Sequence, residues 1–171
     1  METINIQYYK NNYTEFILGS CDNKLCLLDF RYRKMRKIVD NRLKTGLNAQ
    51  FVVKDDEILQ ETRKQLQEYF AMQRKEFEIP LLTVGSAFQK SVWDGLIKIP
   101  YGTVNSYAQL ARTINNEKAV RAVANANGAN AIAIIIPCHR IIGSNGELTG
   151  FGGGIPLKKK LLELEQNLFT I

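Results

Sequence analysis

Two helix-capping signals, 20 residues apart in the second half of the chain, fix where two helices begin. They are Ser86-Ala-Phe-Gln89 and Ser106-Tyr-Ala-Gln109. In such a capping box the serine hydroxyl accepts from the backbone N–H three residues on, and the glutamine side chain reaches back to the serine N–H. The sequence therefore predicts two short amphipathic helices, the second ending at Asn115-Asn116. Apolar residues at helical spacing support them: Phe88, Val92, Leu96 and Ile97 in the first, and Tyr107, Leu110, Ala111 and Ile114 in the second.

A third helix is expected directly afterwards, from about Glu117 to Ala126, with Gly128 as its stop. Two short helices joined by a brief polar turn are typical of a helix-turn-helix, and equally of a plain αα-hairpin inside a core. The third helix is rich in alanine, whereas a helix that reads bases in the major groove needs long polar side chains. On DNA it would make sequence-tolerant contacts to phosphates or in the minor groove, with Arg121 as a candidate wedge in the base stack.

The chemically reactive residues Cys138 and His139 are adjacent in the sequence. They follow the run AIAIIIP at residues 131–137. This run is apolar at both odd and even positions, which predicts a strand buried on both faces. Side chains alternate along a strand, so a bridging water or a turn after Pro137 is needed for the two residues to cooperate. A basic neighbour lowers the pKa of a thiol and makes it a nucleophile, although inert buried cysteines are also common.

Two later segments could complete such a site. The C-terminal helix has a buried face of Leu157, Leu161, Leu164 and Leu168. Glu165 borders this face and Glu163 points away, so Glu165 is the carboxylate that could orient the His139 imidazole. The loop at residues 143–156 holds six of the twelve glycines. It is either a flexible linker or a pocket wall whose backbone N–H groups face a leaving group.

The first half of the chain predicts strands followed by a helix. Glu15–Cys21 and Lys24–Arg31 are strand-like, and Asp22-Asn23 between them suits a hairpin turn. Ile4–Tyr9 is a plausible third strand, and Asp55–Met72 has a helical apolar face. We find no catalytic constellation here. The chain is therefore expected to be an α/β protein, with domains at residues 1–80 and 81–171.

Charge and cysteine content limit the partners and cofactors. The net charge of +6 favours an anionic partner or reflects a basic surface, and the basic run Arg31–Lys37 is interpreted as a solvated edge or loop. With three cysteines and one histidine, we expect no disulfide framework, structural zinc or other cofactor, and we place Cys21 and Cys26 in the core. Neither a bilayer-spanning run nor a signal peptide is evident, so a cytoplasmic protein is expected.

The segment Ile136-Pro-Cys-His-Arg-Ile-Ile142 resembles the signature of the O6-alkylguanine-DNA alkyltransferases. The resemblance extends from about Thr83 to Gln166, through GSAFQKSVW, IPYGTVNSYAQLA, KAVRAVANANGAN, IPCHRII, LTGFGGG and LKKKLLELE. Residues 1–80 match only in length and in their strand-helix pattern. The resemblance implies an RNase H-like N-terminal domain with an antiparallel sheet. It also implies a winged-helix-like C-terminal domain with a helix-turn-helix and a short active-site strand.

The same resemblance implies repair of DNA by direct reversal. The alkyl group, typically methyl, would pass from O6-alkylguanine in double-stranded DNA to Cys138, with O4-alkylthymine as a possible further substrate. The nucleotide is flipped out of the helix first, since the thiol cannot reach the base within the duplex. Because the thioether product has no easy reverse path, each chain would act once, as a monomer without a cofactor.

The residue roles implied by the resemblance divide into three groups. In the chemistry, His139 would deprotonate Cys138 through a water while Glu165 holds His139. Asn130 would brace the turn before the active-site strand, and Arg140 would be a structural arm. Tyr107 would press on a phosphate and protonate the departing guanine at N3, and Arg121 would fill the gap left by the flipped nucleotide. Further DNA contacts would come from Ser106, Ala122 and Asn125, and the substrate pocket would be lined by Ala133, Ile141, Phe151 and Gly152.

Several positions depart from the family pattern. Asn130 is followed by Ala131 instead of the usual proline, and Gly128 replaces a basic residue present in some relatives. In the pocket, Ala133 stands where some members have proline, Phe151 where tyrosine is frequent, and Gly152 where some have serine. None of these positions belongs to the Cys-His-Glu set. They bear on the range of alkyl groups accepted and on the strength of DNA binding.

Three other functions compete with alkyl transfer. A non-catalytic binder of alkylated DNA would share the helix-turn-helix and the pocket, but proteins of that type lack the cysteine that is present here as Cys138. A regulator that senses its own alkylation would carry further modules, for which 171 residues are too few. A cysteine hydrolase could use Cys138, His139 and Glu165, but it would turn over repeatedly.

Overall fold

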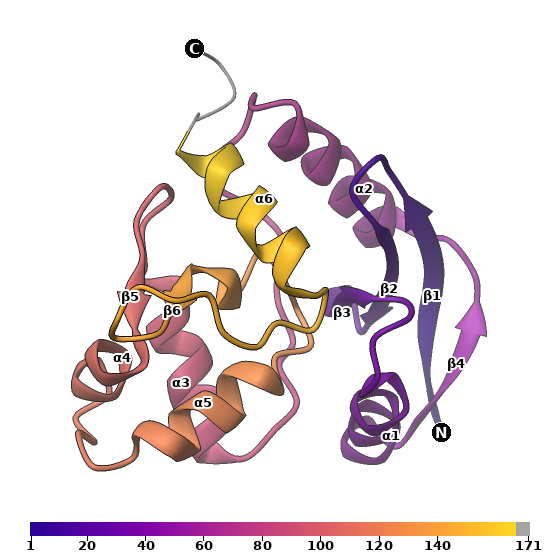
Figure 1. The fold of residues 1–171 in the computed structure, drawn as a ribbon. Coiled ribbons are helices and arrows are strands. Elements are labelled where there is room, and N and C mark those ends of the chain that lie inside the picture. The colour runs from indigo at the N-terminus through magenta and orange to yellow at the C-terminus, as the bar shows by residue number, and fades with distance from the viewer. Residues whose placement is uncertain (167–171) are drawn as a thin grey trace. The chain divides into compact units, whose positions relative to one another are not determined.

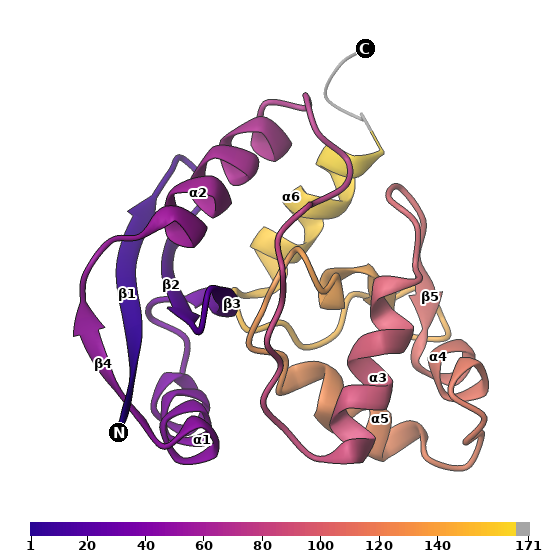
Figure 2. The same ribbon diagram turned by 180° about the vertical axis from the view of Figure 1, so that it is seen from behind.

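The computed structural model describes residues 1–166. The chain divides into two compact units, Met1–Gly85 and Ser86–Ile171, and the second is described up to residue 166. The first unit contains one four-stranded sheet (Figures 1 and 2), whose strand order is β3-β2-β1-β4. Its elements are β1 (Glu2–Lys10), β2 (Glu15–Cys21), β3 (Lys24–Phe30), α1 (Arg36–Leu47), β4 (Ala49–Val53) and α2 (Glu57–Phe70). The strands β1, β2 and β3 pair antiparallel, whereas β4 pairs parallel to β1.

The three predicted strands and the predicted helix α2 of the first unit are confirmed. Asp22 and Asn23 join β2 to β3 with φ values of 54° and 57°, as a type I′ hairpin turn requires. Helix α2 begins at the N-cap Asp56, whose carboxylate accepts from the backbone N–H of Leu59 at 2.9 Å. Its apolar face packs on β1, β2 and β3. Cys21 and Cys26 are both buried, as predicted.

The prediction missed α1 and β4, and it was wrong about part of the basic run that leads into α1. Arg33 and Arg36 bind the buried carboxylate of Asp29, with N–O distances of 3.1 and 2.9 Å. These two side chains are largely buried. Their charges compensate the carboxylate of Asp29, which would be costly to bury without a partner. Helix α1 buries only Val39 and Leu43, so its apolar periodicity is faint in the sequence.

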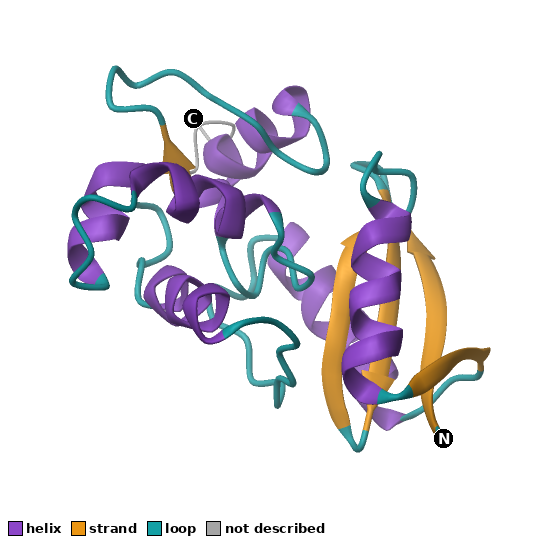
Figure 3. Ribbon diagram, turned by 90° about the horizontal axis from the view of Figure 1, so that it is seen from below, coloured by secondary structure: helices purple, strands orange, loops and turns teal. Residues whose placement is uncertain are grey.

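The second unit is mainly helical. Its elements are α3 (Ala87–Ile97), β5 (Asn105–Ser106), α4 (Tyr107–Thr113), α5 (Val120–Gly128), the 3₁₀ helix η1 (Cys138–Arg140), β6 (Ile141–Ile142) and α6 (Ile155–Glu165). Both capping boxes form as predicted, at Ser86 and at Ser106. Helices α3, α4 and α5 pack on one another, and β5 pairs parallel to β6. Figure 3 shows how short this two-stranded element is beside the helices.

Two details of the predicted helices were wrong. The buried face of α3 includes Trp93, whose indole N–H donates to the Ala126 carbonyl at 2.9 Å, whereas Ile97 is 49% exposed. Helix α5 begins at Val120 rather than near Glu117, because turn hydrogen bonds occupy residues 115–119 and Asn115 adopts a φ of 59°. Gly128 is the last residue of α5 and not a stop beyond it.

The strand predicted at residues 131–137 was also wrong. The segment is buried as expected, but it folds into successive turns. The Ile136 N–H donates to the Ile132 carbonyl at 3.0 Å, and the Ile135 N–H donates to the Ala133 carbonyl at 2.8 Å. Ile134 has a φ of 70°, which is incompatible with a strand and unusual for a β-branched residue. The apolar pattern indicated burial correctly but could not reveal hydrogen bonds made within the segment.

Gly128 gives a prediction on stability, because this helical position is exposed. A Cβ added there would meet no atom within 4 Å. Alanine in a helix is favoured over glycine by about 0.5–1 kcal/mol, so Gly128→Ala should raise the melting midpoint by roughly 1–4 °C. The matched control is Gly95→Ala in α3, whose Cβ would lie 3.0 Å from Leu110 and should lower the midpoint. Thermal unfolding of both variants checks the two signs, and a fall for Gly128→Ala would contradict the prediction.

Candidate active site

Asn130 organises the turn that leads to Cys138. The buried side chain makes three hydrogen bonds to this turn. Its Oδ1 accepts from the Ile132 N–H at 3.0 Å, and its Nδ2 donates to the carbonyls of Ile132 at 3.3 Å and Ile136 at 2.8 Å. These bonds satisfy buried backbone groups that a strand would have paired with a neighbouring strand. Asn130 thereby sets the path of the chain into the 3₁₀ helix that carries the reactive residues.

The 3₁₀ helix η1 consists of Cys138, His139 and Arg140, all of which are buried. It begins after Pro137, so a turn replaces the strand geometry in which neighbouring side chains would point to opposite faces. None of the three cysteines of the chain is in a disulfide. Cys138 is 7% exposed, and its thiol is therefore sheltered from bulk water in this structure.

Glu165, at the end of α6, receives hydrogen bonds from two of these residues. Its Oε2 lies 2.7 Å from Nε2 of His139 and accepts from Nη2 of Arg140 at 2.9 Å, while its Oε1 accepts from Nε of Arg140 at 2.8 Å. The Arg140 guanidinium also donates from Nη1 to the carbonyl of Ile99 at 2.7 Å. The predicted contact between Glu165 and His139 is therefore present, and Arg140 holds the carboxylate in the fork geometry that arginine makes with carboxylates.

The pKa shifts of this cluster define where its protons lie. Burial by itself would raise the pKa of Glu165, but hydrogen bonds from His139 and Arg140 and the charge of Arg140 lower it to about 2. Burial lowers the pKa of His139 below its usual value, although Glu165 acts in the opposite direction. At neutral pH Glu165 is thus a carboxylate and His139 a neutral imidazole, so the Nε2–H of His139 donates to Glu165. The lone pair is then on Nδ1.

This Nδ1 atom of His139 is the basic end of the cluster. It is buried, and residues 1–166 offer it no hydrogen-bond partner. A buried polar atom is costly unless it finds a partner, and an acceptor nitrogen can receive a proton. The arrangement can therefore act as a base at Nδ1, with Glu165 stabilising the imidazolium that results.

Lys158 binds the glycine-rich loop and interacts electrostatically with Cys138. This residue of α6 is fully buried, and its Nζ donates to the carbonyl of Thr149 at 2.8 Å. Burial lowers the pKa of Lys158, while the negative charge of a Cys138 thiolate raises it. By the same attraction, the ammonium group stabilises the thiolate. The Thr149 hydroxyl lies 3.1 Å from the phenol oxygen of Tyr107, so Thr149 links the loop to the first residue of α4.

The residues predicted to contact DNA lie at the start of α4, where Ser106 is the N-cap, and on α5. Arg121, Ala122 and Asn125 are exposed, and their spacing places them on one side of α5. Ser106 is half-buried, and its hydroxyl accepts from the Gln109 N–H at 3.1 Å. The exposed residues of α5 are the one cation Arg121, the polar Asn125, the small Ala122 and Gly128, and Val120 at its start.

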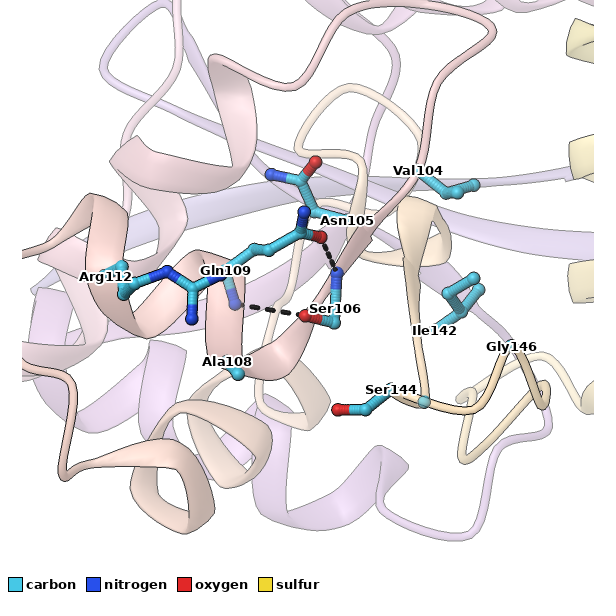
Figure 4. A pocket seen from close by; sticks show the side chains of 10 residues that line it. Val104, Asn105, Ser106, Ala108, Gln109, Arg112, Ile142, Ser144 and Gly146 are labelled. Atoms are coloured by element: carbon cyan, nitrogen blue, oxygen red, sulfur yellow. Dashed lines mark hydrogen bonds between the residues drawn. The ribbon is translucent and has the colours of Figure 1, made fainter.

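A pocket of about 430 Å³ opens beside α4 and the β5–β6 pair (Figure 4). Asn105, Gln109, Arg112 and Ser144 contribute polar side chains to its wall. Its lining does not include Cys138 or the four residues predicted for the substrate pocket. Of those four, Ala133 and Ile141 are buried, and Phe151 and Gly152 are half-buried in the loop before α6.

Comparison with known proteins relates both halves of the chain to the same kind of protein. Residues 87–167 match the family model described as 6-O-methylguanine DNA methyltransferase, DNA binding domain, and residues 4–83 match its ribonuclease-like domain. The methylated-DNA–protein-cysteine methyltransferase of Methanosarcina acetivorans is 50% identical over 113 residues, covering 66% of this chain and 72% of that protein. The chain belongs to the 6-O-methylguanine DNA methyltransferase family.

Other members of the 6-O-methylguanine DNA methyltransferase family agree in sequence and fold. The methylated-DNA–protein-cysteine methyltransferase of Mycobacterium bovis is 52% identical over 103 residues, which are 60% of this chain and 62% of that protein. The crystal structure of Mycobacterium tuberculosis OGT in complex with DNA superimposes with a TM-score of 0.80 at 34% identity, covering 96% of this chain and 93% of that one. These similarities confirm the predicted family and the mixed α/β fold.

Three residues of the candidate site were not singled out in the sequence analysis. Lys158 was given no role, and Thr149 lay in the glycine-rich loop that was interpreted as either a linker or a pocket wall. Asn127 was not singled out at all, yet its Nδ2 donates to the Cys138 carbonyl at 3.5 Å. Helical spacing could have revealed Lys158, because it follows Leu157 at the edge of the buried face. Nothing in the sequence pointed to the other two contacts.

Acidification is expected to lower the folding stability of this protein by protonating the Glu165 carboxylate. The folded-state pKa of about 2 lies below the ordinary value of 4.5. A depressed carboxyl pKa contributes stability that is fully present above pH 4.5 and is lost as the pH falls towards 2. The melting midpoints of the wild type and Glu165→Gln should therefore differ most near neutrality and converge below pH 4.5. Thermal unfolding between pH 7 and 3 measures this, and a constant difference across that range would contradict it.

Proposed function

We propose that the chain repairs alkylated DNA by moving the alkyl group from O6-alkylguanine to the sulfur of Cys138. The observation that carries this proposal is the buried Arg140–Glu165–His139 arrangement next to a cysteine, in a chain of the methyltransferase family. One chain would accept one alkyl group and then be spent. O4-alkylthymine in DNA is a possible second substrate.

The first step is loss of the thiol proton. A water between Cys138 and Nδ1 of His139 passes the proton to the imidazole, and Glu165 stabilises the positive charge that forms. Lys158 stabilises the thiolate by its neighbouring positive charge. The histidine is suited to this task because burial keeps it neutral before the reaction.

Displacement at the alkyl carbon follows. The sulfur forms the C–S bond in line with the C–O6 bond that breaks, and the electron pair of that bond remains on the guanine oxygen. Tyr107 donates its phenol proton to N3 of the departing guanine. The proton that left the thiol for His139 then returns through water to the phenol, so that overall the thiol proton ends on guanine. Thr149 supports the phenol of Tyr107 through their 3.1 Å contact. Ala133, Ile141, Phe151 and Gly152 line the space for the base.

DNA binding belongs to the second domain, residues 81–171. The exposed cation Arg121 fills the space that the flipped nucleotide leaves, while Ala122, Asn125, Ser106 and Tyr107 contact the strand near it. The small side chains on α5 permit a close approach to the groove, and few of them can read base edges. The predicted domain of residues 1–80 has a structural role, and the chain acts as a monomer in the cytoplasm.

Intact mass tests the proposal. The wild type and Cys138→Ala are incubated with a short duplex that contains one O6-methylguanine. The wild type should gain one methyl group per chain and then stop, whereas Cys138→Ala should gain none. Tight binding of the damaged duplex without a mass change would instead identify a non-catalytic lesion binder. Repeated turnover with released alcohol would identify a hydrolase.

A further inference from the structure

A tight turn after α3 lies against the cluster around Glu165, and the proposed chemistry gives this turn no role. It runs from Pro100 to Thr103, and the Thr103 N–H donates to the Pro100 carbonyl at 3.2 Å. Gly102 has a φ of 80°, whereas the φ of Tyr101 is negative. A positive φ at the third position alone is the pattern of a type II turn, which favours glycine there. The sequence therefore specifies this turn locally.

The turn and the residue before it contact both members of the buried ion pair. The carbonyl of Ile99 accepts from Nη1 of Arg140 at 2.7 Å. The ring of Tyr101 lies over the same guanidinium, with its centroid 5.7 Å from Cζ. Gly102 is so close to the backbone carbonyl oxygen of Glu165 that an added Cβ would lie 3.3 Å from it. The glycine thus permits the close approach that places the tyrosine ring over the arginine.

The hydrogen bonds of Arg140 hold its guanidinium only within the plane of the group. Its Nη1 binds the Ile99 carbonyl, and its Nε and Nη2 bind the two carboxylate oxygens of Glu165. An aromatic ring over the face of a guanidinium attracts it and limits its tilt out of this plane. Without the ring of Tyr101 the guanidinium could tilt, and its bonds to the carboxylate would weaken because hydrogen bonds depend on alignment.

The orientation of His139 depends on the same carboxylate. Oε2 of Glu165 accepts from Nη2 of Arg140 at 2.9 Å and lies 2.7 Å from Nε2 of His139. The other ring nitrogen, Nδ1, has no partner in the described residues 1–166. The position of Oε2 therefore decides which way the imidazole is held. Any tilt of the guanidinium is passed on to His139 through this shared oxygen.

We propose that Tyr101 is a positioning residue for alkyl transfer, which acts by covering the Arg140 guanidinium. The ring thereby keeps Glu165 directed at Nε2 of His139, so that the lone pair stays on Nδ1. The face of the ring does this and not the hydroxyl group. Burial and the charge of Glu165 raise the pKa of Tyr101, so the phenol stays neutral and adds no charge of its own. The effect on the transfer rate rests on the proposed function, whereas the effect on His139 exists in the free protein.

The first test observes the imidazole directly. His139 is the only histidine in the chain, so its ring nitrogens are assigned without ambiguity in nitrogen-labelled protein. Long-range proton–nitrogen NMR spectra show which ring nitrogen carries the proton. At neutral pH, Nε2 should carry it in the wild type and in Tyr101→Phe, which keeps the ring. In Tyr101→Leu both tautomers should be populated, and the separation between the two nitrogen shifts should shrink.

The second test measures single-turnover methylation of Cys138 by intact mass. Tyr101→Leu should react roughly 2- to 30-fold more slowly than the wild type, as the loss of one cation–π contact implies. Tyr101→Phe should react at the wild-type rate. In the Glu165→Gln background, Tyr101→Leu should change the rate by less than about 2-fold, because the carboxylate through which Tyr101 acts is absent. A merely structural loss would slow both backgrounds equally.

The matched control is Tyr8→Leu in the first unit, where a tyrosine ring covers Arg31 at 3.7 Å. It removes the same kind of contact and should change neither the His139 spectrum nor the rate. All variants are compared where circular dichroism shows them folded, and Tyr101→Met replaces Tyr101→Leu if that protein does not fold.

Two outcomes would overturn the inference. One is a folded Tyr101→Leu protein with the wild-type spectrum of His139. The other is a Tyr101→Phe protein that reacts as slowly as Tyr101→Leu. Failure of the proposed function looks different, because the wild type would then show no methylation while the spectra would still report on His139.

Discussion

Glu165→Gln is expected to slow transfer to Cys138 by roughly 100-fold or more, the range expected when a general base is disabled. Three donors converge on the two carboxylate oxygens, one from His139 and two from Arg140. A glutamine amide has one oxygen and one NH2 group, so at least one donor would face another donor. The carboxylate that stabilises an imidazolium at His139 is lost as well. Single-turnover methylation measured by intact mass checks the rate.

The same substitution should also lower stability. Arg140 would remain buried without its counter-charge, and breaking a buried ion pair typically costs about 3–5 kcal/mol. The matched control is Glu163→Gln, two residues earlier on α6, whose carboxylate is 3.9 Å from Lys159 at the surface. It should change stability by less than about 0.5 kcal/mol. The rates are compared at a temperature where circular dichroism shows all proteins folded. Equal rates for the two variants would refute the role given to Glu165.

Local signals in the sequence were enough to predict where α3 and α4 begin and that Glu165 turns inward to His139. The capping boxes at Ser86 and Ser106 depend on residues three apart, so they formed as predicted. Glu165 was predicted to turn inward because it borders the leucine face of α6, and the structure confirms Leu157, Leu161 and Leu164 on that face. Leu168 of the same prediction lies outside the described residues. The hairpin at Asp22 is equally local, since both turn residues tolerate a positive φ.

The remaining features depend on contacts between residues far apart or on unusual backbone geometry. Strand β4 joins the sheet through parallel pairing with β1, although Val53 at its end is exposed and gives little apolar signal. The turn at residues 131–137 depends on a single asparagine, which no pattern of apolar residues can encode. Lys158 is buried because its ammonium reaches a backbone carbonyl in the loop. In each case the pattern of apolar residues does not show the deciding contact, and only the family resemblance had pointed to Asn130.

Asn130→Ala is the second substitution with a large expected effect, because it releases this turn. The Ile132 N–H loses its partner, while the carbonyls of Ile132 and Ile136 each keep a backbone donor but lose their second one. A buried N–H left unpaired costs about 1–3 kcal/mol and each lost hydrogen bond about 0.5–1.5 kcal/mol, and partial relaxation offsets part of this, so we expect a loss of about 2–4 kcal/mol. The matched control is Asn125→Ala on the exposed side of α5, which should change stability by less than about 0.5 kcal/mol. Chemical denaturation measures both.

The effect of Asn130→Ala on the reaction follows from the strain in the same turn. Ile134 is a β-branched residue at a φ of 70°, a conformation that costs about 1–3 kcal/mol and persists only when its surroundings enforce it. Without Asn130 the turn can relax, and the chain would enter η1 along a different path, moving Cys138 relative to His139. Methylation should therefore slow in Asn130→Ala even where the protein is fully folded. Asn130→Asp keeps the acceptor for the Ile132 N–H but sets a carboxylate oxygen against the carbonyls of Ile132 and Ile136, so its rate should fall as well. A folded Asn130→Ala protein with the wild-type rate would show that the turn does not position the cysteine.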